Sequence, residues 1–149
     1  MDLNNISFGK PVLDSGNTGK PDSLVEIGRE KISSLKSAIV EIETLIFERE
    51  ALSRIFSDEI EKIKTSIENF LLKNVAVDSE DFKERNGLRQ KQIEVSELAL
   101  NERVNCWRDV ALLKKELREY KKELSEKEER MKMFNDILDD SKGLKGGSY

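Results

Sequence analysis

The chain has 149 residues and a net charge of −4, and 38% of its residues are charged while only 6% are aromatic. An acidic chain lacks the clustered basic face typical of broad nucleic-acid binding, and a chain without histidine lacks the commonest general base and zinc ligand. A single cysteine, Cys106, cannot form an intramolecular disulfide or a cysteine metal site, which favours an intracellular protein, cytoplasmic or nuclear. Together with the lack of histidine, this leads us to expect no catalytic residue, no cofactor and no metal.

The first segment, residues 1–22, is rich in asparagine, serine and glycine, contains both prolines of the chain and has no helical period. Such a composition cannot bury enough apolar surface to offset the entropy of ordering, so we expect a disordered tail. A few apolar residues in it, among them Phe8, could instead form a short peptide that becomes ordered on a partner.

Residues 23–74 are predicted to form the first helix. Ser23 and Glu26 have the spacing of a capping box, which places the helix start at Ser23. Apolar residues then recur at alternating steps of three and four, the pattern of a left-handed coiled coil, while Arg49 and Ser53 indicate a local widening or shift of the stripe. The predicted seam of this helix consists of Ile32, Leu35, Ile39, Ile42, Ile46, Phe56, Ile60, Ile63, Ile67 and Phe70.

Residues 75–78 are predicted to form a short connection, because the apolar pattern stops there and Asp78 or Ser79 can cap a second helix. That helix is predicted over residues 79–141. Its stripe has no single seven-residue frame between Leu88 and Val104, but it becomes regular later. The predicted seam here consists of Val110, Leu113, Leu117, Tyr120, Leu124, Met131, Phe134 and Leu138.

The glycine-containing segment 142–149 is predicted to be a flexible tail, since glycine favours helix ends. The two helices have similar lengths and a short connection, which favours an all-α, coiled-coil helical hairpin. The alternative is a pair of extended helices, each of which dimerises with a second chain. The heptad pattern alone is compatible with both arrangements.

Two features near the second seam are candidate partner contacts. Trp107 lies beside the seam, where it could cover a flank or anchor a partner, and Cys106 is predicted to be a small buried hydrophobe on the seam. A basic segment follows, and the glutamates interleaved in it predict a solvated, salt-bridged face, with contact to a phosphate or an acidic partner as the alternative. Its cations are Lys114, Lys115, Arg118, Lys121 and Lys122.

These observations favour a non-enzymatic structural or adaptor subunit that binds other protein subunits through coiled-coil pairing, with homo-oligomer formation left open. A hairpin of two long helices also resembles, in architecture, the stalk subunits of flagellar and type III export machinery. This resemblance implies a stalk or chaperone-like hairpin associated with a motor or secretion ATPase. A third hypothesis, nucleic-acid association through residues 114–122, is disfavoured by the acidic net charge. No apolar run approaches the ~20 residues of a membrane span, so no membrane insertion is expected.

Overall fold

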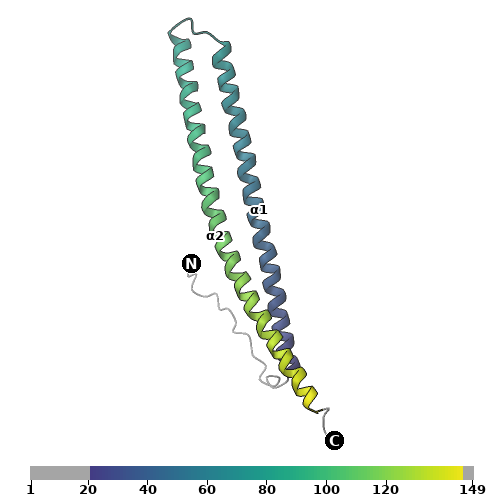
Figure 1. Cartoon of the computed structure of the whole chain (residues 1–149). Helices are drawn as coiled ribbons and strands as arrows, with labels where there is room; N and C mark the ends of the chain where they lie inside the picture. Colours follow the sequence, from purple (N-terminus) through teal and green to yellow (C-terminus); the bar gives the residue numbers. More distant parts are fainter. Residues whose placement is uncertain (1–20, 146–149) are drawn as a thin grey trace, which may run out of the picture. The chain divides into compact units, whose positions relative to one another are not determined.

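The computed structural model describes residues 21–145, which form two helices, α1 from Pro21 to Lys73 and α2 from Ser79 to Lys145 (Figure 1). Residues 74–78 connect them, and the described part of the chain contains no strand. The prediction of an all-helical fold with two long helices is therefore confirmed. The predictions for residues 1–20, including the partner contact of Phe8, and for residues 146–149 lie outside the described residues.

The helix ends differ from the predicted bounds by a few residues. Helix α1 begins at Pro21, two residues before the predicted start, and a proline suits the first helical turn because its missing N–H would have no partner there. Helix α2 continues to Lys145, four residues past the predicted end at residue 141. Gly143 lies inside it, and no described glycine has a positive φ. A glycine costs a helix only about 1 kcal/mol relative to alanine, so it does not have to end one.

Two aspartates cap the start of α2. The Asp78 carboxylate accepts a hydrogen bond from the Asp81 backbone N–H at 2.9 Å, and the Asp81 carboxylate accepts one from the Val77 N–H at 3.0 Å. This reciprocal arrangement satisfies amides that have no partner within the helix. The negative charge also favours the positive end of the helix dipole. Capping thus fixes the point at which the chain enters α2.

The end of α1 is closed by a side chain from α2. Arg85 Nη1 donates hydrogen bonds to the backbone carbonyls of Leu71, at 3.0 Å, and of Asn74. The side chain and backbone N–H of Asn74 both donate to the carbonyl of Phe70, at 3.0 and 3.1 Å. Helix ends leave their last carbonyls without helical partners, and a cation there complements the helix dipole. Arg85 therefore joins the two helices next to their connection.

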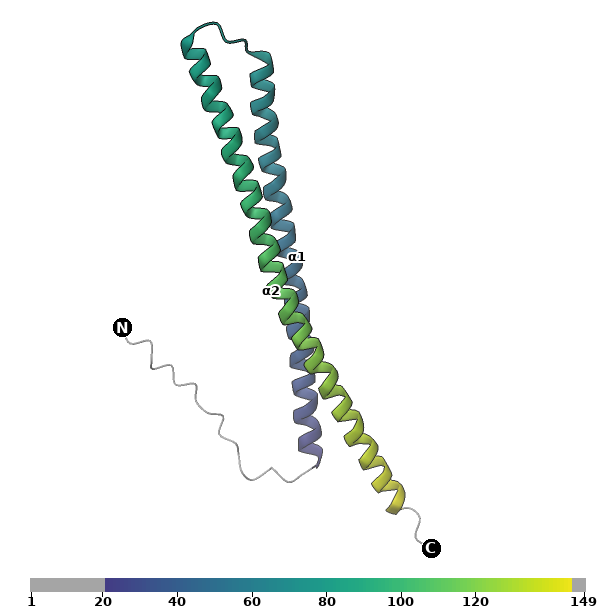
Figure 2. The same ribbon diagram turned by 60° about the vertical axis from the view of Figure 1, so that its left-hand side comes forward.

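The described residues fall into two compact units. The connection unit comprises residues 37–122, and the terminal unit comprises residues 21–36 together with 123–145. In the connection unit, α1 and α2 lie side by side in both views (Figure 1, Figure 2).

Cross-helix contacts in the connection unit show that α1 and α2 run antiparallel. Lys121 of α2 pairs with Glu43 of α1 at 3.3 Å, and Gln92 donates to Glu68 at 3.2 Å. As the residue number rises along α1, the number of its partner on α2 falls. This arrangement is consistent with a helical hairpin. In the terminal unit, Lys36 of α1 pairs with Glu128 of α2 at 3.5 Å.

The core between the helices is thin. No described side chain is almost completely enclosed, because a contact between two helices covers each side chain from one side only. All the buried hydrophobic residues belong to the predicted seam, and they are Leu35, Ile39, Ile42, Ile60, Ile67 and Val110. Leu35 belongs to the terminal unit and the other five to the connection unit.

Two helical glycines give a matched test of local packing. Gly87 faces open space, so Gly87→Ala should raise the free energy of unfolding by roughly 0.5–1 kcal/mol through helix propensity. A methyl group added at Gly28 would overlap the terminal methyl of Met131, so Gly28→Ala should gain less. Urea unfolding followed by circular dichroism measures both changes. An equal gain at the two sites would show that Met131 moves aside at no cost.

Candidate functional site

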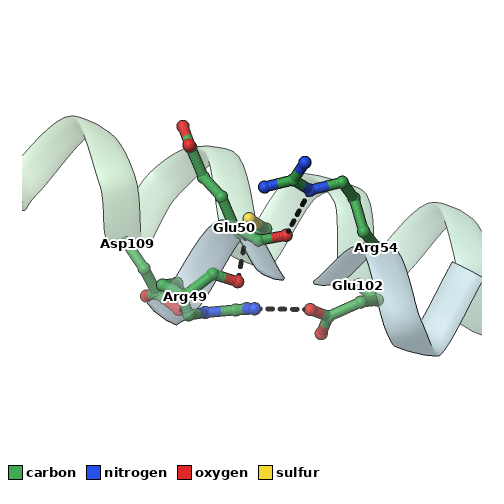
Figure 3. Close-up of polar contacts among 6 residues, drawn as sticks. Arg49, Glu50, Arg54, Glu102 and Asp109 are labelled. Atoms are coloured by element: carbon green, nitrogen blue, oxygen red, sulfur yellow. Dashed lines mark hydrogen bonds and ion pairs between the residues drawn. The ribbon is translucent and has the colours of Figure 1, made fainter. Parts of the chain in front are cut away.

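The polar interruption of the α1 seam is an ion-pair cluster between the helices. Arg49 Nη1 lies 2.6 Å from Glu102 Oε1, and its Nε lies 2.8 Å from Asp109 Oδ2 (Figure 3). Cys106, which lies between these two acids in the sequence, makes a weak contact from its Sγ to the Arg49 carbonyl at 3.9 Å. The hydrogen bonds to Glu102 and Asp109 raise the pKa of Arg49, so its guanidinium stays charged in the folded protein.

This arginine cluster bears on how the two helices align. The Arg49 and Glu102 side chains are each 22% exposed, so water is only partly excluded from their contact. A charged pair on a helix seam favours the alignments in which both partners are satisfied. We therefore interpret the arginine cluster as a device that sets the register of α1 against α2. In the sequence, Arg49 stands out as the one charged residue in an otherwise apolar or small seam, but nothing marks its two partners.

The predicted α1 seam follows the observed contact at most positions up to Ile60, and beyond Ile60 it agrees at Ile67 but not at Ile63 or Phe70. Ile32 and Ile46 are half-buried, and the buried members are those named above. Ile63 and Phe70, in contrast, are 45% and 39% exposed, whereas Lys64 and Leu71, one residue further along, are half-buried. The predicted burial of Phe56, Ile63 and Phe70 therefore needs correction.

Helix geometry explains this shift of register. A straight α-helix has 3.6 residues per turn, so residues seven apart drift by about 20° relative to a strict heptad repeat. Because of this drift, the residue that follows a heptad position moves toward the facing helix, α2. Over two heptads it is enough to replace Ile63 by Lys64 and Phe70 by Leu71 on the contact face. Phe56, which is 38% exposed, already lies at its edge.

The predicted α2 seam lies along the contact with α1. Val110 is buried, and the other members are half-buried, namely Leu113, Leu117, Tyr120, Leu124, Met131, Phe134 and Leu138. Cys106 is half-buried as well. The members from Val110 to Tyr120 belong to the connection unit and the rest to the terminal unit.

The irregular segment between Leu88 and Val104 contains two overlapping patterns. Leu88 and Val95 are half-buried and lie on the contact face together with small or polar residues. Ile93, Leu98 and Leu100 are exposed. No single seven-residue frame fits because some apolar residues here face α1 while others face solvent.

Some of the exposed apolar residues of α2 form a stripe that extends beyond this irregular segment. Its members recur at steps of seven, four, three and four, so they share one face of the helix. We call this set the α2 outer stripe, and it consists of Ile93, Leu100, Val104, Trp107 and Ala111. Trp107 is 74% exposed on this stripe. Sequence reasoning singled out Trp107 but missed the stripe, although its heptad spacing was a usable signal.

Helix α1 carries a second exposed apolar stripe at the flank of its contact face. Its members recur at steps of seven and four, and all are at least 38% exposed. We call this set the α1 flank stripe, and it consists of Leu45, Leu52, Phe56, Ile63 and Phe70. Both stripes lie in the connection unit.

The cations of the basic segment after Trp107 are all exposed, and one of them makes an ion pair across the helices. Lys121 makes the ion pair with Glu43 of α1 described above. Among the ion pairs of residues 21–145, none joins Glu119 to Lys115 or Lys122, although those spacings predicted such pairs. Lys115 and Lys122 lie four and eleven residues after Ala111, so they extend the face of the α2 outer stripe.

Over the described residues, no set of three or more cysteine, aspartate or glutamate side chains is placed to hold a metal ion together. No helix in the same part of the chain has the length and apolar character required to cross a membrane.

Comparisons with known proteins add no assignment. No family model, no curated protein and no solved structure gives a significant match to this chain.

Proposed function

We propose that this chain is a non-enzymatic structural or adaptor subunit whose two helices pair as a coiled-coil hairpin and whose outer faces bind protein. One observation carries the proposal: the connection unit exposes two separate apolar stripes, each regular enough to receive a helix. Exposed apolar residues gathered on one face of a helix are a feature of protein–protein contact sites. Heptad-spaced anchors suit an amphipathic helix in particular.

The coiled-coil interpretation is supported by the spacing of the contacts. Residues on the α2 side of the contact recur mostly at alternating steps of three and four, from Leu88 to Leu138. The arginine cluster supplies a polar pair of the kind that fixes alignment in coiled coils. Antiparallel pairing with a short connection is the usual arrangement of a helical hairpin.

A site-specific photocrosslinker tests whether the stripes bind protein. It is placed at Trp107 on the α2 outer stripe, or at Leu52 on the α1 flank stripe, in the full chain expressed in its native cells. We expect discrete protein adducts from both positions. Asp58, an exposed residue of α1 outside both stripes, is the control position and should give none. Adducts only with nucleic acid, or none at either stripe, would contradict the proposed function.

A further inference from the structure

We infer that a second copy of this chain covers the exposed stripes: the α1 flank stripe of one copy packs antiparallel against the α2 outer stripe of another. This inference rests on the proposed function of the chain as a protein-binding module, and it names the partner. Within one copy, the exposed fractions of Leu52, Ile63, Leu100 and Trp107 run from 45% to 74%, so neither stripe covers the other.

The first support is a match of apolar residues. The alignment is antiparallel and sets Phe70 of one copy opposite Ile93 of the other. Any two residues that face each other then have numbers that add up to the same value as 70 and 93. Three further pairs of stripe members then face each other, while Leu45 and Val104 face charged residues. The facing pairs are Phe70 with Ile93, Ile63 with Leu100, Phe56 with Trp107, and Leu52 with Ala111.

The second support is complementary charge in the same alignment. Glu41 and Glu48 each precede a member of the α1 flank stripe by four residues, so they share its face. The alignment places Glu48 opposite Lys115 and Glu41 opposite Lys122. Two pairs of exposed, oppositely charged residues thus face each other just beyond the last apolar pair, Leu52 with Ala111. Complementary charges of this kind select partner and register more than they add affinity.

The remaining positions in this alignment are compatible with contact. Leu45 faces Arg118, whose methylene stem can lie along an apolar side chain while its guanidinium stays in water. Glu59 faces Val104 and already has an ion-pair partner, Lys62, at 2.9 Å. A parallel alignment of the same stripes is worse, because it carries Lys115 and Lys122 beyond Glu41 and Glu48 and so loses the complementary charges.

The geometry of the contact determines the type of assembly. The matched segments, residues 41–70 and 93–122, are each ~44 Å long at 1.5 Å per residue. Because the two surfaces in contact are different, each contact leaves one stripe unused on either copy. A heterologous contact of this kind gives open chains of copies unless the rotation between them closes a ring. The mass of the assembly should therefore rise with concentration.

Charge reversal tests the alignment in the full chain. One variant carries Glu41→Lys and Glu48→Lys, a second carries Lys115→Glu and Lys122→Glu, and a third carries all four changes. Sedimentation equilibrium over a range of concentrations measures self-association. We expect each double variant alone to associate about tenfold more weakly than the wild type, since two attractive pairs become repulsive. The fourfold variant, and an equimolar mixture of the two double variants, should regain wild-type association.

The control variant carries Asp58→Lys and Glu61→Lys, which makes the same change in net charge as the Glu41→Lys and Glu48→Lys variant, but at exposed positions outside both stripes. It should associate as the wild type does, and all variants should keep the wild-type helical signal in circular dichroism. A wild-type chain that stays monomeric, or double variants whose association is unchanged or is not rescued by the fourfold variant, would overturn the inference. Photocrosslinked adducts with a different protein, together with a monomeric wild type, would overturn it and leave the proposed function standing.

Discussion

Replacing Ile60 by aspartate should unfold the paired helices of the connection unit, whereas the same replacement at Ile63 should leave them folded. Ile60 is 6% exposed on the contact face of α1, and Ile63 is 45% exposed beside it. A carboxylate placed at Ile60 would lose water without gaining a partner, at a cost of roughly 3–5 kcal/mol. In a single copy of the chain, at a concentration too low for association, the carboxylate at Ile63 stays hydrated, so the expected loss is about 1 kcal/mol or less. Thermal melts followed by circular dichroism compare the two variants directly.

Milder substitutions at the same two positions provide the control. Ile60→Ala should cost about 2–4 kcal/mol by removing buried methyl groups, and Ile63→Ala should cost much less. If both aspartate variants lost equal stability, the contact stripe would pass through Ile63 as an unbroken heptad repeat predicts. The shift to Lys64 would then be refuted.

Replacing Arg49 by alanine should lower the free energy of unfolding by about 1–2 kcal/mol, because it breaks two charge-assisted hydrogen bonds in a contact that water still reaches. Most of the loss should come from Glu102, which is 22% exposed and would keep its charge without a partner. Asp109 is 50% exposed and is easily hydrated, so it should contribute little. Urea unfolding of the Arg49→Ala, Glu102→Ala and double variants gives the coupling energy of the pair.

Replacing the ion pair of Arg49 and Glu102 by apolar residues distinguishes its effect on stability from its effect on the register of the helices. Arg49→Met with Glu102→Leu should restore most of the stability, because apolar residues of similar size fit a helix seam. The same double variant should lose the preference for one register, which spin labels on α1 and α2 would report as a broadened distance distribution. A coupling energy near zero for Arg49 and Glu102, unchanged by salt, would refute the proposed role of the arginine cluster.

Much of the fold could be predicted because the apolar period is a property of the chain itself. Steps of three and four identify helices without any knowledge of a partner, and the end of that pattern near Asn74 locates the connection. The contact face was harder to predict, because its position depends on how the two helices wind together. A seven-residue frame therefore selected Ile63 where the structure uses Lys64.

The exposed candidate contacts could be predicted only in part, because residue type alone does not show which apolar residues face outward. Trp107 and the basic segment stand out by residue type, whereas Ile93, Leu100 and Val104 look like ordinary core residues in the sequence. Only the paired structure shows that they face outward. The partners of Arg49 were equally hidden, because Glu102 and Asp109 are two among many acids on an acidic chain.

The bond from Arg85 to the end of α1 has a consequence for how the chain folds. Arg85 and Leu71 are separated by 14 residues, whereas Gly28 and Met131 approach each other across 103 residues. Closing a short loop costs less entropy than closing a long one, and contacts between nearby residues form faster. Helix pairing should therefore nucleate beside the connection and spread away from it. A chain cut within residues 75–77 would retain the contacts between its helices but lose this nucleus, and its two fragments would meet at a rate set by their concentration.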